Sequence, residues 1–123
     1  MAKLTTHLAI KRAYEAAMPE DGKRVLIDRL WPRGLSRARA QIDFWLKDAA
    51  PSDELRRWYG HDPEKFSEFR RRYEAELAGE TGQQALEQIH ELMKQGPVTL
   101  VFAARDEEHS NAAVLHDLLL HEK

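Results

Sequence analysis

Short apolar runs and longer amphipathic segments alternate along this 123-residue chain. Residues 8–12, 24–28 and 98–102 each contain an apolar run of the length that forms a buried strand. Residues 41–46 alternate apolar and polar side chains, which favours a further strand. The pattern therefore predicts several short strands that are separated by helices.

Helical spacing is clearest between residues 62 and 95. Asp62 and Pro63 are typical of a helix start, and an apolar stripe follows at Phe66, Phe69, Tyr73 and Leu77. Thr81 with Gln84 resembles a capping box for a second helix, which Gly96 and Pro97 would end. Short helical segments are also expected after Ser36 and after Pro51.

The last strand leads into a final helix. We expect Asp106 to cap this helix and to place His109 in its first turn, with an inner face at Ala112, Leu115, Leu118 and Leu119. A helix–strand–helix order over residues 82–120 is typical of α/β proteins. The sequence thus predicts a single domain over residues 1–123, with a small, largely parallel sheet and helices packed on its faces.

Composition narrows the function classes. The chain has no cysteine, which excludes disulfides, thiolate catalysis and cysteine-ligated zinc. No apolar run approaches the roughly 20 residues of a membrane span, so we expect a cytoplasmic protein without a membrane partner. The net charge of −2 does not suggest a nucleic-acid-binding surface. The sequence leaves the oligomeric state open.

The charge is unevenly distributed. Residues 23–39 contain six basic side chains and one acidic side chain, Asp28, so this segment carries +5 and the rest of the chain −7. One interpretation is a solvated loop whose arginines pair with acidic helices. The other is an anion-binding patch, because the planar guanidinium suits phosphate and carboxylate.

Two polar loops follow predicted strands, at residues 28–34 and 103–109. Ligands of open α/β sheets bind beyond the carboxyl ends of the strands, so we expect these loops to meet with the turn at 58–62 beside them. Arg29, Arg33 and Arg105 are then the predicted anion-binding residues. The alternative is a web of internal salt bridges with Asp28, Asp43 and Asp106.

The same loops carry groups suited to acid–base chemistry: Asp28, His61, Asp106 and His109. Gly60 can supply a turn with positive φ that aims His61. The alternative, which the sequence favours slightly, is that each histidine only hydrogen-bonds and orders its own turn.

Trp31 and Asn111 complete the predicted ligand-binding set. Trp31 can stack on a ring of a ligand or pack into the core. The histidine spacing does not indicate a metal site, no glycine-rich phosphate loop is present, and we expect no cofactor.

Three stretches together resemble the YeaO-like proteins, the domain of unknown function numbered 488. They are DRLWPRG at 28–34, WYGHDPEK at 58–65 and AARDEEH at 103–109, and the resemblance extends from about Ile10 to Leu119. It implies a small α/β protein of bacterial or archaeal type with no established activity.

Two function classes follow from the residues. The first, slightly favoured, is an enzyme that acts on a phosphorylated or nucleotide-like small molecule at a pocket lined by Arg, Asp and His side chains. The second is a non-catalytic module that senses such an anion or binds a partner.

Overall fold

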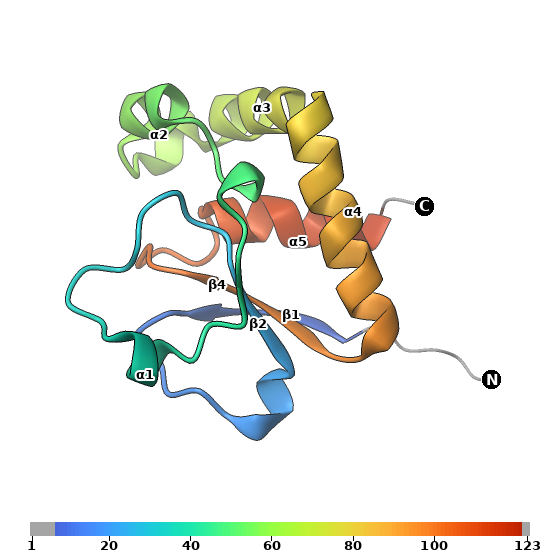
Figure 1. The fold of residues 1–123 in the computed structure, drawn as a ribbon. Helices are drawn as coiled ribbons and strands as arrows, with labels where there is room; N and C mark the ends of the chain where they lie inside the picture. The colour runs from blue at the N-terminus through green and yellow to red at the C-terminus, as the bar shows by residue number, and fades with distance from the viewer. Residues whose placement is uncertain (1–6, 122–123) are drawn as a thin grey trace.

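The α/β prediction is confirmed by a computed structural model that describes residues 7–121. Within these residues a four-stranded parallel sheet has the order β1-β4-β2-β3 (Figure 1). Its strands are β1 (Leu8–Arg12), β2 (Lys23–Leu26), β3 (Phe44–Trp45) and β4 (Val98–Phe102). The central strand β4 pairs with both β1 and β2, so that Leu8 and Lys23 each face Val98.

Two strands are shorter than the sequence predicts. β2 ends at Leu26. Beyond this point Ala103 N donates to the Asp28 carboxylate at 2.9 Å and not to a backbone carbonyl, so the ladder between the two strands stops. β3 has only two residues, because the chain first completes a helical turn and leaves it through Gln41 at φ 48°. The predicted strands 8–12 and 98–102 are found within those limits.

The long helices pack on one face of the sheet. They are α2 (Asp53–Tyr59), α3 (Phe66–Leu77), α4 (Glu80–Gln95) and α5 (Asn111–His121). Val25, Ile27, Leu100 and Phe102 point from the strands into the core that these helices close. The apolar stripe of α3 is part of this core, as its helical spacing predicts.

The other face is covered by a loop segment rather than by long helices. Leu26 and Val101 point to this side, where Trp31, Leu35 and Trp45 pack against them. The segment contains the short helix α1 (Arg37–Ala40), whose first turn is capped by Ser36 Oγ as predicted. Three 3₁₀ turns complete the described chain: η1 (Pro19–Asp21), η2 (Lys47–Ala49) and η3 (Pro63–Lys65).

Two predicted helix caps are wrong. α4 begins at Glu80, with Gly79 as its N-cap and no side-chain cap, so Thr81 already lies inside the helix. α5 begins at Asn111, where Ser110 Oγ accepts a hydrogen bond from Ala113 N at 3.1 Å. Asp106 therefore does not cap α5.

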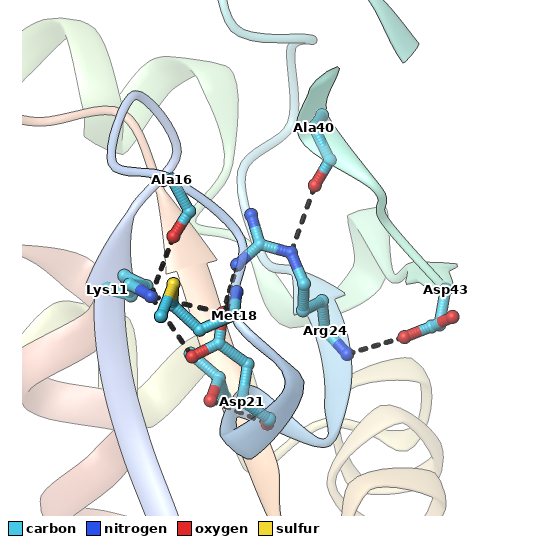
Figure 2. Close-up of polar contacts among 8 residues, drawn as sticks. Lys11, Ala16, Met18, Asp21, Arg24, Ala40 and Asp43 are labelled. Atoms are coloured by element: carbon cyan, nitrogen blue, oxygen red, sulfur yellow. Dashed lines mark hydrogen bonds and ion pairs between the residues drawn. The ribbon is translucent and has the colours of Figure 1, made fainter. Parts of the chain in front are cut away.

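A buried ionic cluster fixes the amino-terminal end of β2 (Figure 2). Asp21 accepts from Arg24 Nη1 at 2.7 Å and from Lys11 Nζ at 3.1 Å, while Arg24 Nε donates to Ala40 O at 2.9 Å. Only 3% of Arg24 is exposed. The cluster ties β1, β2 and the end of α1 together.

Candidate functional site

A cavity of about 630 Å³ lies at the carboxyl ends of β2 and β4. The chain leaves β2 towards β3 on one side, whereas it leaves β4 towards α5, which packs on β4 and β1 on the other side. These two connections diverge, and such a switch point is where open α/β sheets bind ligands. Figure 1 shows the two loops side by side below α2.

The cavity brings together all nine side chains that the sequence predicts for the site. They come from the loop after β2, the turn after α2, the loop after β4 and the start of α5: Asp28, Arg29, Trp31, Arg33, His61, Arg105, Asp106, His109 and Asn111. The prediction that the three loops meet is therefore confirmed. The chemical use of these side chains is a separate question.

Asp28 joins the two main loops. Its Oδ2 accepts from Ala103 N at 2.9 Å and its Oδ1 accepts from Asn111 Nδ2 at 3.1 Å. Asn111 Nδ2 also donates to Ile27 O at 3.0 Å. Burial raises the pKa of Asp28, and the two hydrogen bonds offset only part of that effect.

Within residues 7–121 the three predicted anion-binding arginines have no acidic partner. No ion pair within residues 7–121 joins Arg29, Arg33 or Arg105 to a carboxylate. Arg29 Nε donates instead to Pro51 O at 3.2 Å. Asp43 accepts a hydrogen bond from Arg24 N, and Asp106 pairs with His109. The alternative, a web of salt bridges between these aspartates and the three arginines, is therefore not found in this part of the chain.

Asp106 and His109 form a dyad at the rim of the cavity. His109 Nδ1 lies 2.7 Å from Asp106 Oδ2, and the His109 ring packs edge-on against Phe66. A hydrogen bond to a carboxylate requires a proton on Nδ1, which leaves Nε2 of a neutral imidazole as an acceptor. The hydrogen bond from His109 lowers the pKa of Asp106. His109 precedes α5 by two residues, so the prediction that it lies in the first helical turn is wrong.

His61 lines the cavity from the turn after α2. Gly60 and His61 both have positive φ, 54° and 58°, so the expected left-handed turn is present. No hydrogen bond of the His61 imidazole is found within residues 7–121, and its ring faces Tyr59 at 6.4 Å between centroids. Its position is thus set by the backbone, at a conformation uncommon for a residue other than glycine.

Trp31 has structural contacts as well as a place in the cavity wall. Its Nε1 donates to Leu35 O at 2.6 Å, and its ring meets Trp45 edge-on. The Arg37 guanidinium covers the ring at 4.4 Å from the centroid. Part of the indole surface is therefore already occupied by the protein.

Comparison with known proteins identifies the family. A family model described as "Inactive DUF488-N3 subclade" matches residues 7–123. This chain belongs to the YeaO-like DUF488 family.

Its relatives match over nearly their whole length. An uncharacterized protein of Mycobacterium tuberculosis (strain ATCC 25618 / H37Rv) is 45% identical over 114 residues, which cover 93% of this chain and 94% of the relative. The uncharacterized protein YeaO of Escherichia coli (strain K12) is 36% identical over 113 residues, which cover 92% and 96%. No solved structure matches the chain.

In this DUF488 protein Arg56 and Tyr59 are among the cavity side chains that sequence reasoning missed. Tyr59 OH donates to His109 O at 2.5 Å, and desolvation raises the pKa of this phenol to about 12. Arg56 reaches the cavity from α2, and its Nε is buried. Their positions in the sequence indicated only a short helix, because helical periodicity does not say which loop a helix will cover.

The described chain offers no evident metal centre. Across residues 7–121, no three histidine or acidic side chains lie close enough together to hold a metal ion. No helix in the same range is long and apolar enough to cross a membrane. The charged and imidazole side chains that line the cavity are those of arginine, aspartate and histidine, beside apolar side chains.

Proposed function

We propose that this DUF488 protein binds a small phosphorylated or nucleotide-like anion in the cavity and acts as a non-catalytic receptor for it. The observation that supports the proposal is the set of three arginines, Arg29, Arg33 and Arg105, that line one cavity and have no acidic partner in the part of the chain that the structure describes. Guanidinium groups that are free to form two parallel hydrogen bonds favour phosphate and carboxylate ligands.

The charge of the cavity supports the same conclusion. Four arginines and two aspartates line it, whereas the whole chain carries a net charge of −2. An excess of positive charge at a concave site attracts anions even when the protein is acidic overall. A volume of about 630 Å³ is within the range of sites for small organic ligands.

Binding is favoured over catalysis for two reasons. Asp28, the carboxylate best placed to act as an acid or base, already holds the two loops together through Ala103 and Asn111. The matching family model is also described as an inactive subclade. A carboxylate that maintains the shape of a pocket suits a receptor.

Replacement of Arg105 by lysine tests the proposal. Lysine keeps the charge but lacks the fork, so we expect Arg105→Lys to weaken binding about tenfold, the loss that follows from one charge-assisted hydrogen bond. Calorimetry with inorganic pyrophosphate, ribose 5-phosphate and adenosine monophosphate at two ionic strengths measures it. The difference between the two proteins should shrink at high salt, because exposed charges are screened.

The control is Arg71→Lys, since Arg71 lies on α3, is paired with Glu68 and does not line the cavity. Equal affinities of wild type and Arg105→Lys for all three compounds would show that Arg105 has no part in binding. Absence of binding to any of them would reject the anion site.

A second candidate function, an enzyme acting on the same class of ligand, is favoured by the Asp106–His109 dyad. Asp106 orients the imidazole so that Nε2 can accept a proton, an arrangement that general bases use. In this case His109 would take a proton from a water or hydroxyl group beside the bound anion. The proton would later return to the leaving group.

Turnover assays distinguish the two functions. Phosphate release from nucleotides and sugar phosphates is measured with wild type and His109→Gln. An enzyme should lose activity by about 100-fold or more on loss of its general base. A receptor should bind these compounds with both proteins and release no phosphate with either.

A further inference from the structure

Arg56 lines the cavity from α2 with a guanidinium group that is only partly hydrogen-bonded within residues 7–121. Its Nη2 donates to Asp53 Oδ1 at 3.2 Å, but no acceptor for the buried Nε is found within residues 7–121. Nε has essentially no accessible surface, so a ligand in the cavity does not reach it. Arg56 Nη1 is not buried and makes no hydrogen bond within residues 7–121, so it can donate to an oxygen atom of a ligand in the cavity.

The helix that carries Arg56 is held firmly in place. At the start of α2, Ser52 N and Oγ donate to the Glu76 carboxylate of α3 at 2.9 and 2.6 Å. The preceding carbonyl, Pro51 O, accepts from Arg29 Nε at 3.2 Å. Arg29, from the loop after β2, and Arg56, from α2, are therefore both tied to the start of α2.

Asp28 lines the same cavity and retains hydrogen-bonding capacity. Each of its oxygens accepts one N–H from the protein, whereas an ionised carboxylate offers about four acceptor sites. Arg56 and His61 are close enough for their charges to oppose the effect of burial on the pKa of Asp28. Yet no ion pair between Asp28 and either group is found in the described residues.

We propose that Arg56 and Asp28 recognise two different groups of one ligand, so that the Arg56 guanidinium donates to a phosphate oxygen and Asp28 accepts a hydrogen bond from a sugar hydroxyl. The ligand is then a phosphorylated sugar, either free or as part of a nucleoside monophosphate. This inference rests on the proposed anion-binding function and specifies its ligand.

Calorimetry on the full chain tests the contribution of Arg56. Ribose 5-phosphate and inorganic phosphate are titrated into wild type, Arg56→Lys and Arg57→Lys. Arg57→Lys is the control, because the Arg57 side chain is exposed and does not line the cavity. We expect Arg56→Lys to weaken both probes about tenfold, because lysine keeps the charge but lacks the planar guanidinium and its Nη donors. Arg57→Lys should bind like wild type.

The contribution of Asp28 is tested through the ligand, so that no buried acid has to be replaced. Tetrahydrofurfuryl phosphate has the ring and phosphate of ribose 5-phosphate without its hydroxyl groups. We expect it to bind wild type about tenfold more weakly than ribose 5-phosphate, since it cannot donate to a carboxylate. The affinities of adenosine monophosphate and ribose 5-phosphate are also compared. The compound that binds more tightly shows whether the ligand is a nucleotide or a free sugar phosphate.

The outcomes separate this inference from the proposed function. If Arg105→Lys weakens phosphate binding but Arg56→Lys does not, the anion site stands and the assignment of Arg56 is overturned. Equal affinities for ribose 5-phosphate and tetrahydrofurfuryl phosphate would overturn the assignment of Asp28. If no phosphate compound binds wild type, both the proposed function and this inference fail.

Discussion

Two aspartates at the ends of β2 show how neighbours set the charge state of a residue. Burial alone raises the pKa of Asp21, but hydrogen bonds from Met18 N, Lys11 and Arg24 outweigh it, and the net pKa is lowered. Asp28 has no cation in direct contact, and burial leaves its pKa raised. The difference follows from hydrogen-bonded cations at one end of the strand and neutral donors at the other.

Asp21 should make the free energy of unfolding depend on pH in the acid range. Its lowered pKa means that the ionised form stabilises the folded state above about pH 3.8, and this contribution is lost as the pH falls below that value. We expect Asp21→Asn to lower the free energy of unfolding at pH 7 by about 3 kcal/mol, because the buried Arg24 and the partly buried Lys11 both lose the carboxylate with which they pair. The deficit relative to wild type should shrink towards pH 3.

Urea unfolding at a series of pH values measures this effect. Asp48→Asn is the control, since Asp48 is exposed in η2 and has no ion pair within residues 7–121. A deficit for Asp21→Asn that stays constant from pH 7 to pH 3 would contradict the assignment of the lowered pKa to this carboxylate.

At the scale of elements, the corner between α3 and α4 depends on one glycine. Gly82 is buried in the first turns of α4, and a Cβ atom there would lie 2.6 Å from both the Cα and the carbonyl oxygen of Leu77. These are backbone atoms at the end of α3, so they cannot move away as a flexible side chain would. The close approach of the two helices therefore requires glycine at this position.

Gly82→Ala should destabilise the protein, although alanine is the better helix former by about 1 kcal/mol. We expect the free energy of unfolding to fall by about 2 kcal/mol, because the helices must separate to admit the methyl group. Chemical denaturation provides the measurement. Thr81→Ala, an exposed change in the same turn, should be neutral or slightly stabilising, and a stabilising effect of Gly82→Ala would exclude the close contact.

Element boundaries show where local sequence signals compete. Thr81 and Asp106 both match cap preferences, but the helices begin after Gly79 and Ser110. Asp106 instead accepts from the backbone and ring of His109, within the loop before α5. A cap is decided by which residue has extended backbone at the helix start, and the packing of the preceding loop sets that conformation.

For the whole molecule, the direction of the chain after each strand determines where the cavity forms. The connections after β2 and β4 leave in opposite directions, and the opening between them is lined by both loops. α2 then closes one side with Arg56 and Tyr59. The site therefore depends on parallel strands, whose carboxyl ends share one edge of the sheet.

The two faces of the sheet are covered in different ways, which explains the position of Trp31. Long helices close one face, whereas the loop that carries Trp31, Leu35 and Trp45 closes the other. Trp31 therefore both packs on the sheet and borders the cavity. The sequence allowed either core packing or a place in the site for Trp31, and in the structure this side chain does both.

The sequence alone determined the α/β class, the strands at 8–12 and 98–102, the helical stripe of α3 and the loops that form the site. These features depend on periodicity and chain direction, which act over a few residues. Only the tertiary structure decided the sheet order, the caps of α4 and α5, the inclusion of Arg56 in the cavity and the lack of acidic partners for the three arginines among the described residues. The physical reason is that pairing and desolvation depend on groups far apart in sequence, such as Asp28 and Ala103, which meet only when the sheet assembles.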